Sequence, residues 1–583
     1  MAKKIYKSVP DMSKARNRVD LPILRRDEIV IPAELKRFAE GKKYWICTFG
    51  CQANVRDEEI MAGYLELAGY TKASNEAEAN IAIVNTCAVR ENAEEKVYGE
   101  IGKYKANHLK DKDFILAVCG CMMQEEGVAK TLMERYPYIN LIFGTHNVPD
   151  LLNLLDDHLK HKKDYVDVHS FPGDIIENLP STRLDEYKAF VNITYGCDKF
   201  CTYCIVPYTR GRERSRLKED VVAECKALVE DGFQEITLLG QNVNSYGKDF
   251  HDGTSFASIL EEVAKLGIPR LRFMTSHPWD FSDEMLDVIA KYPNIMHCIH
   301  LPVQSGSDEV LRQMGRRYGR KEYLDLVRRI REKIPDCAIT TDIIVGFPNE
   351  TEEQFLDTLS LCQEVRYDAA FTFIYSPRKG TPAARMVDNV SDADKHERFM
   401  RLVKVVEQGV ESHAAEMLGK TYKVLVDGPS KKDPTMLSGY TESSKLVHFK
   451  GPASLRGHIV DVRITESHTF SMIGELTEDA WITLAKDLSA SLKENEEVSK
   501  RYFECKKACD EDKSVALLQE KISVSQKEMM RLASAGDDAG YLHAKKEYEA
   551  AKRELESHPL VQNKLSAYEE LRELLLSVAK ELS

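Results

Sequence analysis

Three cysteines lie close together about a third of the way along the chain, at Cys197, Cys201 and Cys204. Thiolates are soft ligands that favour iron–sulfur clusters, and three of them can ligate three irons of a four-iron cube while the fourth iron stays open. An open metal position can bind a substrate, whereas a structural site fills every position with protein. The spacing therefore predicts a catalytic four-iron cluster; the alternative is a zinc knuckle with a remote fourth ligand.

Three further cysteines follow three short apolar runs near the start of the chain, at residues 44–49, 80–85 and 114–118. Amphipathic segments such as residues 90–106 separate these runs, which is the pattern of a parallel α/β sheet. Cys51, Cys87 and Cys121 come at the carboxyl ends of the runs, where open α/β sheets bind ligands. This placement predicts a second cluster with its own open iron.

The other cysteines are expected to be structural. Cys47 and Cys119 lie inside the apolar runs, where strand pleating would direct them into the faces of the sheet. Cys505 and Cys509 share one helical face, which favours a packing seam over a metal site. Four more are scattered through the middle of the chain and are expected in the core: Cys225, Cys298, Cys337 and Cys362.

The composition is that of an ordinary globular protein of several domains: 583 residues, 43% hydrophobic and 30% charged. The formal net charge of −13 argues against a nucleic-acid partner unless basic patches are local. The chain shows neither an apolar run long enough to span a membrane nor a secretory leader, so we expect a cytoplasmic protein without a disulfide framework.

The central region predicts six repeats of strand and helix. The strands are expected at residues 189–194, 235–239, 270–274, 298–302, 338–345 and 370–375, with helices such as 217–231, 283–292 and 320–333 between them. Six such units make a partial barrel, whose active residues belong on the loops after the strands. His277 and His300 stand near these loops and are either acid–base groups or, as we favour, buried hydrogen-bonded residues.

The C-x3-C-x2-C spacing resembles the signature of the radical S-adenosylmethionine (SAM) enzymes. In that family the open iron chelates SAM, and one electron cleaves it to a 5'-deoxyadenosyl radical. The resemblance makes polar groups after and within the strands candidates for holding SAM: Gln241, Asn242, Gln304 and Ser305 after strands, and Asp342 within the strand at residues 338–345.

Two basic patches could contact RNA. Arg210, Arg212, Arg214 and Arg216 alternate directly after the cysteine loop, so in an extended segment they would face one side, as phosphate contacts require. The alternative is that they pair with nearby carboxylates. Short strands at residues 422–426, 445–449 and 459–464 predict a small antiparallel barrel. Its candidate RNA contacts are Lys431, Lys432 and Lys445.

Residues 43–478 resemble the MiaB-type tRNA methylthiotransferases. The likeness rests on TFGCQAN at residues 48–54, NTCAVRE at 85–91 and GCMMQ at 120–124, and on motifs at 196–216, 239–246, 300–307 and 342–348. Ala53 departs from the methionine usual there, which puts little in doubt. The family's TRAM domain, an RNA-binding barrel, corresponds to residues 416–478.

This resemblance implies two 4Fe–4S clusters. Cys197, Cys201 and Cys204 would hold the cluster with exchangeable SAM, and Cys51, Cys87 and Cys121 an auxiliary cluster that presents sulfur. The implied reaction is methylthiolation at C2 of N6-isopentenyladenosine at position 37 of tRNA, in the anticodon loop. An external electron donor and a sulfur source would be needed. The alternatives are methylthiolation of threonylcarbamoyladenosine or of a ribosomal protein side chain, and a non-catalytic iron–sulfur RNA-binding regulator.

The expected architecture is an α/β multidomain protein, monomeric, with six parts. These are a basic N-terminal arm (1–42), a parallel-sheet domain (43–160), a linker (161–187), a radical SAM core (188–415), a TRAM barrel (416–478) and a helical domain (487–583). The last part resembles the YlbF-type domains, so we expect a docking module for a protein partner, with a dimerisation helix pair as the alternative. Two helices are predicted within it, around residues 515–532 and 565–576.

Overall fold

The computed structural model describes residues 4–17, 23–25, 29–88, 91–170, 175–477, 480, 496–535 and 537–581. The chain divides into two compact units. The first contains Met1–Lys420, Tyr440–Val447 and Ile464–Ile473, and the second contains Thr421–Gly439, His448–Arg463 and Gly474–Ser583. None of the described helices is long and apolar enough to cross a membrane.

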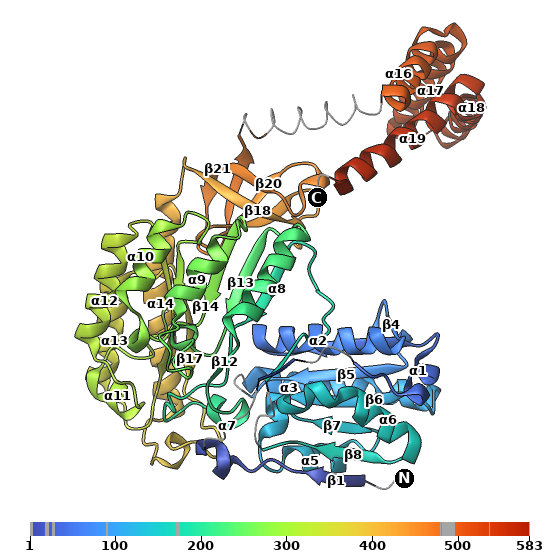
Figure 1. Cartoon of the computed structure of the whole chain (residues 1–583). Helices are drawn as coiled ribbons and strands as arrows, with labels where there is room; N and C mark the ends of the chain where they lie inside the picture. Colours follow the sequence, from blue (N-terminus) through green and yellow to red (C-terminus); the bar gives the residue numbers. More distant parts are fainter. Residues whose placement is uncertain are drawn as a thin grey trace. The chain divides into compact units, whose positions relative to one another are not determined.

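The first domain is a parallel sheet of seven strands in the order β1-β8-β7-β6-β5-β3-β4 (Figure 1). The three predicted strands are confirmed as β3 (Lys43–Thr48), β5 (Ile81–Thr86) and β6 (Ile115–Gly120). The other strands are β1 (Lys4–Ser8), β4 (Thr71–Lys72), β7 (Leu141–Phe143) and β8 (Asp164–Asp167). The central strands β5 and β6 are buried on both faces, which is why they read as continuous apolar runs.

Helices cover both faces of this sheet. On one face α1 (Ala33–Ala39), α2 (Gln52–Ala68) and α6 (Leu151–His161) pack against Ile83 and Ala117. On the other face α3 (Glu91–Lys103) and α5 (Val128–Arg135) pack against Val84 and Val118. Cys119 lies in the first of these cores, as expected for a structural cysteine.

Two expectations for the flanks of this domain were wrong. Residues 1–42 are not simply a loose arm, because β1 pairs in parallel with β8 and Leu35 of α1 is fully buried. Residues 161–187 are not only a linker, because β8 completes the sheet and β9 (Ile175–Glu177) pairs with β2 (Ile23–Arg25). Strand β1 lies at the edge of the sheet, and both β1 and β8 are short and carry charged residues, so they lack the apolar pattern of the central strands. Arg18, Arg26 and residues 171–174 lie outside the described residues.

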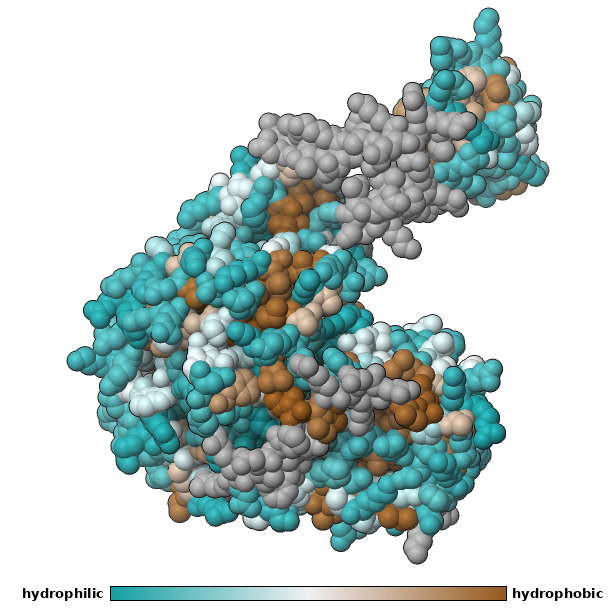
Figure 2. Space-filling view, in the orientation of Figure 1, coloured by the Kyte–Doolittle hydropathy of each residue, from teal (hydrophilic) through white to brown (hydrophobic). Residues whose placement is uncertain are grey.

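The central domain confirms the six predicted strands as two parallel sheets of three. They are β10 (Lys188–Asn192), β13 (Glu235–Leu239) and β14 (Arg270–Met274), and β15 (Cys298–His300), β16 (Ala338–Val345) and β17 (Ala369–Ile374). An isolated parallel β-bridge pairs Leu271 of β14 with Ile295, which precedes β15 of the second sheet. Outside the strands lie α8 (Lys218–Glu230), α9 (Phe256–Ala264), α10 (Asp283–Lys291), α12 (Arg320–Lys333), α13 (Glu352–Val365) and α14 (Asp392–Glu416). Their outward faces are largely hydrophilic (Figure 2), and Cys225, Cys337 and Cys362 lie in the shared core.

The small barrel is confirmed as a closed barrel of five strands. They are β18 (Thr421–Pro429), β19 (Leu437–Thr441), β20 (Leu446–Lys450), β21 (Ile459–Ser467) and β22 (Met472–Leu476). Closure removes the exposed edges that so short a sheet would otherwise present.

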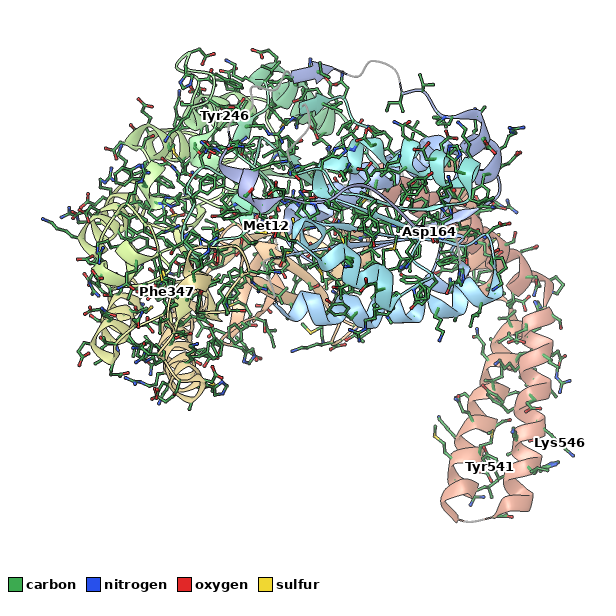
Figure 3. All side chains as sticks on the ribbon, turned by 90° about the horizontal axis from the view of Figure 1, so that it is seen from below. Met12, Asp164, Tyr246, Phe347, Tyr541 and Lys546 are labelled. Carbon is green, nitrogen blue, oxygen red and sulfur yellow. The ribbon has the colours of Figure 1, made fainter. Side chains whose placement is uncertain are left out.

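The C-terminal region is helical, as predicted, but it has four described helices where the sequence pattern gave two. They are α16 (Glu496–Glu511), α17 (Lys513–Ala535), α18 (Asp538–Ser557) and α19 (Pro559–Glu581). Helix α17 packs along α18, which carries the labelled Tyr541 and Lys546 (Figure 3), and α16 packs along α19. Cys509 is buried and Cys505 half-buried, in agreement with a packing seam.

Candidate active site with two cysteine trios

The first cysteine trio lies in a loop that the chain closes at its base. Strands β11 (Thr194–Tyr195) and β12 (Arg214–Ser215) pair antiparallel on either side of it. Gly196 has a φ of 69°, and a Cβ there would collide with the Arg212 carbonyl oxygen, so the turn into the loop requires glycine. Thr202 anchors the far side, because its Oγ1 donates to the Gln313 carbonyl oxygen at 2.8 Å.

Cys201 is buried, and Cys197 and Cys204 are half-buried. Burial raises the pKa of Cys204 to about 12, with a further contribution from Cys201. Burial also raises the pKa of Cys197, against hydrogen bonding from the Lys199 backbone. Arg316 is buried beside them and its Nη1 donates to Cys201 Sγ at 3.6 Å. If these cysteines bind a metal cluster as thiolates, the positive charge of the irons would offset the free-energy cost of burying the thiolates.

Arg316 contacts the cysteine loop, and the sequence did not reveal this contact. Its Nε donates to the Tyr318 hydroxyl at 2.9 Å, which holds the guanidinium against the cysteine loop. It lies more than a hundred residues from Cys201, and no local motif distinguishes it from its exposed neighbour Arg317.

The second trio gathers at the carboxyl edge of the N-terminal sheet. Cys51 caps the start of α2, Cys87 directly follows β5, and Cys121 begins the 3-10 helix η3 (Cys121–Gln124) after β6. Gly50 and Gly120 precede two of them with φ of 154° and 100°. A Cβ on Gly50 would lie 2.9 Å from the Cβ of Cys87, and one on Gly120 would collide with the Thr86 carbonyl oxygen. Glycine therefore lets the three loops approach one another.

Hydrogen bonds fix this edge. Asn54 Nδ2 donates to the Thr86 carbonyl oxygen at 3.0 Å, and Asn85 Nδ2 donates to the Asn54 carbonyl oxygen at 2.8 Å. These reciprocal bonds tie the start of α2 to the end of β5. Cys51 and Cys87 are thereby held at neighbouring positions.

The thiols of the second trio influence one another. Hydrogen bonding from Cys87 and the charge of Arg210, opposed by burial, lower the pKa of Cys51 to about 5. Burial raises the pKa of Cys121 to about 11, and Arg210 partly offsets this shift. The structure therefore brings together the three cysteines that the sequence placed at separate strand ends.

Both trios fit a four-iron cluster better than a single metal ion. The donors in each are thiols, which iron–sulfur clusters prefer. Within the described residues, no three histidine, cysteine or acidic side chains lie close enough together to hold a single ion. A four-iron cube binds each thiolate at a different iron, so it accepts a wider spacing than one ion does.

A cavity of about 170 Å³ lies between the sheet domain and the central domain, beside Cys51 and Gly196. Cys51 and Asp57 line it from the sheet domain, and Gly196, Arg210 and Gln241 line it from the radical SAM core. Much of the remaining wall is apolar and consists of Ile60, Val148, Pro149, Ile176, Leu179, Leu239 and Met274. One chamber thus reaches a cysteine of the second trio and the residue next to Cys197.

The candidate SAM contacts lie in different surroundings. Gln241 lines the cavity. Asn242 is buried and its Nδ2 donates to Asp280 at 2.7 Å, while its Oδ1 has no hydrogen-bond partner within the described residues. Gln304 adopts a φ of 75° between β15 and β16. Asp342 lies 3.5 Å from His300 Nε2.

Ser305 requires a correction. It is fully buried, its hydroxyl bonds that of Thr358 at 3.2 Å and accepts from the Ser307 backbone N–H. The hydroxyl therefore fixes the loop against α13 and does not face a ligand. Sequence placed this serine on the correct loop but could not give the direction of its side chain.

The two histidines are hydrogen-bonded residues, as favoured from the sequence. His277 accepts from the Trp279 backbone N–H at 3.3 Å, and burial together with Arg316 lowers its pKa to about 2. His300 Nδ1 lies 3.0 Å from Thr340 Oγ1. These contacts give both side chains a structural role.

The arginine patch does not form a free phosphate-binding surface. Arg210 pairs with Asp57 at 2.8 Å, Arg212 with Asp198 at 2.7 Å, and Arg216 with Glu177 at 2.6 Å. Arg214 instead lies over the Tyr195 ring and lines the cavity. For Arg210, Arg212 and Arg216 the carboxylate-paired alternative is the correct one, because the loop folds back against acidic side chains from distant segments.

The lysines of the barrel also separate into two kinds. Lys445 was expected to contact RNA, but its Nζ donates to the Asp368 carbonyl oxygen at 2.7 Å and pairs with the Asp368 carboxylate. Lys431 and Lys432 are exposed and remain predicted RNA contacts.

A partial barrel of six strands with three cysteines after its first strand defines the class of the radical SAM enzymes. The Radical SAM superfamily matches residues 191–362. Uncharacterized protein family UPF0004 matches residues 43–144, the TRAM domain 415–477, and the family described as control of competence regulator ComK, YlbF/YmcA matches 482–583.

Curated relatives define the family more narrowly. The chain is 51% identical over 472 residues to the tRNA-2-methylthio-N(6)-dimethylallyladenosine synthase of Geobacillus kaustophilus, which covers 81% of this chain and 89% of the relative. It is 50% identical to the synthase of Bacillus subtilis, with 81% and 93% covered. The chain belongs to this family of radical SAM enzymes, whose cofactors are SAM and 4Fe–4S clusters.

Among solved structures the similarity is more distant. The radical SAM methyltransferase TsrM from Kitasatospora setae is 13% identical, with a TM-score of 0.43, and covers 59% of this chain and 74% of its own.

Proposed function

We propose that the chain is a tRNA methylthiotransferase that converts N6-isopentenyladenosine at position 37 into its 2-methylthio derivative. The names of the curated relatives support this substrate. The TRAM match and the exposed Lys431 and Lys432 support an RNA partner. An adenosine in the anticodon loop suits the site, because an unpaired base can enter a pocket without melting a duplex.

One observation carries the proposal: Cys51 and Gly196 line the same cavity. Cys197, Cys201 and Cys204 would hold the cluster that binds SAM, and Cys51, Cys87 and Cys121 the auxiliary cluster. When bound, these cofactors supply the radical that removes the C2 hydrogen and the methylated sulfur that replaces it. A base in the cavity would lie beside both sets of ligands.

The walls of the cavity favour an isopentenyl group. Ile60, Ile176 and Leu179 offer apolar contacts of the kind that a branched hydrocarbon chain requires. A threonylcarbamoyl group carries a carboxylate; of the two arginines that line the cavity, Arg210 is paired with Asp57 and Arg214 lies over the Tyr195 ring. The apolar wall therefore supports the isopentenyl substrate over the threonylcarbamoyl alternative.

Polar groups in the same cavity can orient the base. Thr194 Oγ1 is buried at this wall and has no hydrogen-bond partner in the described part of the chain. Gln241 offers both a donor and an acceptor. Together they can bind the polar edge of an adenine while the apolar wall holds its N6 substituent.

The test is the nucleoside composition of tRNA from a strain that lacks the protein. We expect isopentenyladenosine to accumulate without its 2-methylthio form, and restoration by the parent chain. Unchanged methylthio content would reject the proposal.

Two cysteine variants separate the two halves of the reaction. Cys197→Ala should abolish 5'-deoxyadenosine release from SAM, whereas Cys51→Ala should retain release but form no methylthio product. No release by the reduced parent protein would instead favour a non-catalytic iron–sulfur regulator.

The remaining expectations concern partners. Turnover would require an external electron donor and a sulfur source. The helical domain at residues 487–583 would bind a protein partner, in line with its YlbF/YmcA match. Mass measurement of the purified protein in solution would test the expected monomer.

A further inference from the structure

Arg210 belongs to the radical SAM core but contacts a cysteine of the other trio. It follows Cys204 by six positions and lies just after the short helix α7 (Val206–Thr209). Its Nε donates to Cys121 Sγ at 3.1 Å, and its Nη2 donates to Asp57 Oδ2 at 2.8 Å. The loop that carries the first trio thus provides a hydrogen bond to a sulfur of the second.

The surroundings fix this contact. Arg210 is buried, and its backbone N–H donates to the Val206 carbonyl oxygen at 2.8 Å. Ile205, next to Cys204, packs with Cys121, with Ala88 and with Met12, which is labelled in Figure 3. Backbone and side chain are therefore both held where the guanidinium meets the sulfur.

We propose that Arg210 is a positioning residue that raises the reduction potential of the auxiliary cluster. The inference rests on the proposed ligand role of Cys121. Reduction adds negative charge to a cluster, and hydrogen bonds to its sulfurs are one of the factors that set its potential. A buried guanidinium bonded to Cys121 stabilises the reduced form by charge as well as by the N–H donor.

Asp57 opposes this effect, so the proposal predicts potential shifts of opposite sign for loss of Arg210 and loss of Asp57. Its carboxylate neutralises much of the guanidinium charge near the cluster, while its ion pair holds Arg210 in place. Loss of Arg210 should lower the potential, whereas loss of the Asp57 charge should raise it. A residue that only docks two domains would not give opposite shifts in these two variants.

The experiment uses the full chain with Cys197, Cys201 and Cys204 replaced by alanine, so that only the auxiliary cluster is present. The midpoint potential is measured by redox titration followed by electron paramagnetic resonance. Arg210→Gln should weaken reduction about tenfold, which is a shift of about 59 mV to lower potential for one electron. Asp57→Asn should shift the midpoint in the other direction.

Controls keep the result decisive. Arg210→Lys retains the charge but lacks the two separate guanidinium nitrogens that bond Cys121 and Asp57, so we expect an intermediate shift to lower potential. This variant keeps the test valid if Arg210→Gln loses its cluster. Arg328→Ala removes an exposed arginine paired with Asp325 at 3.0 Å on α12, and should leave the midpoint unchanged.

Two results would overturn the inference. Unchanged midpoint potentials in Arg210→Lys and Asp57→Asn, or shifts of the same sign, would reject the tuning role of Arg210 but not the ligand role of Cys121. Absence of any cluster from the triple-alanine chain would reject the ligand assignment of Cys121 and the tuning role with it.

Discussion

Arg56 Nη2 on α2 lies 2.9 Å from Glu224 Oε1 on α8, so an ion pair joins the sheet domain to the radical SAM core. Glu224 also pairs with Arg183 and with Arg216, each at 2.7 Å. Three guanidinium groups from separate segments thus share one carboxylate. This junction lies between the elements that carry the two cysteine trios.

Removal of the shared charge should destabilise the protein. Glu224→Gln removes the carboxylate that the three guanidinium groups share, while Arg56 and Arg183 keep Glu59 and Arg216 keeps Glu177. We therefore expect a cost of about 2 kcal/mol, in the range of a lost hydrogen bond to a charged group. The free energy of unfolding in urea should fall by about that amount. Glu230→Gln on the same helix, which breaks an exposed pair with Lys226, should cost less than about 1 kcal/mol. Equal effects of the two variants would contradict the role of the junction.

The same carboxylate predicts a pH dependence. Burial alone would raise the pKa of Glu224, but Arg216, Arg56 and Arg183 outweigh burial and lower it from 4.5 to about 2. A carboxyl group with a lowered folded pKa stabilises the fold above its unfolded pKa, and this contribution is lost as the pH falls towards the folded value. The difference in unfolding free energy between the parent chain and Glu224→Gln should therefore shrink between about pH 5 and pH 3. A difference that does not change over this range would argue against the pairing.

Gly120 should be essential for the auxiliary trio. A Cβ there would collide with the Thr86 carbonyl oxygen, next to Cys87, so Gly120→Ala must move the strand end that carries Cys121. We expect bound iron to fall by about four per chain, the content of one cluster. Gly127→Ala is a matched control, because Gly127 also has a positive φ but open space around it. Its strain of about 1 kcal/mol should leave the iron content unchanged.

The apolar wall should set the substrate. Leu179→Asn places a polar group against the expected isopentenyl site and should lower kcat/KM for isopentenylated tRNA about 10- to 100-fold. Release of 5'-deoxyadenosine without tRNA should persist, because Leu179 does not belong to the loop that carries the first cysteine trio. Leu184→Asn, at an exposed leucine of the same segment, is the control. Equal loss in both variants would show a general defect of this segment.

Sequence pattern predicted the central strands well because burial of both faces leaves a continuous apolar signal. The expected bounds of β13, β14 and β16 agree with the structure at both ends. Strands β1 and β8 were missed because both are short, carry charged residues and pair with a segment far away in the sequence. The sequence pattern also failed to indicate α16 and α18, whose residues are mostly polar.

For the candidate site, the strand ends predicted where the cysteines gather but not what surrounds them. Alternating arginines indicate a common side, yet nothing in residues 210–216 reveals that the partners are Asp57, Glu177 and Glu224. Arg316 was missed for the same reason, since its contact with Cys201 depends on the fold of a remote loop. Local pattern predicts elements, whereas the charge of a site depends on tertiary pairing.

The central claim is that each cysteine trio holds a four-iron cluster beside one cavity. The trios are Cys51, Cys87 and Cys121, and Cys197, Cys201 and Cys204. The most direct measurement is the iron and sulfide content of the anaerobically reconstituted chain, together with that of each triple-alanine variant. The account predicts about eight irons in the parent chain and about four in either variant. About four irons in the parent chain, with none lost in one of the variants, would contradict it.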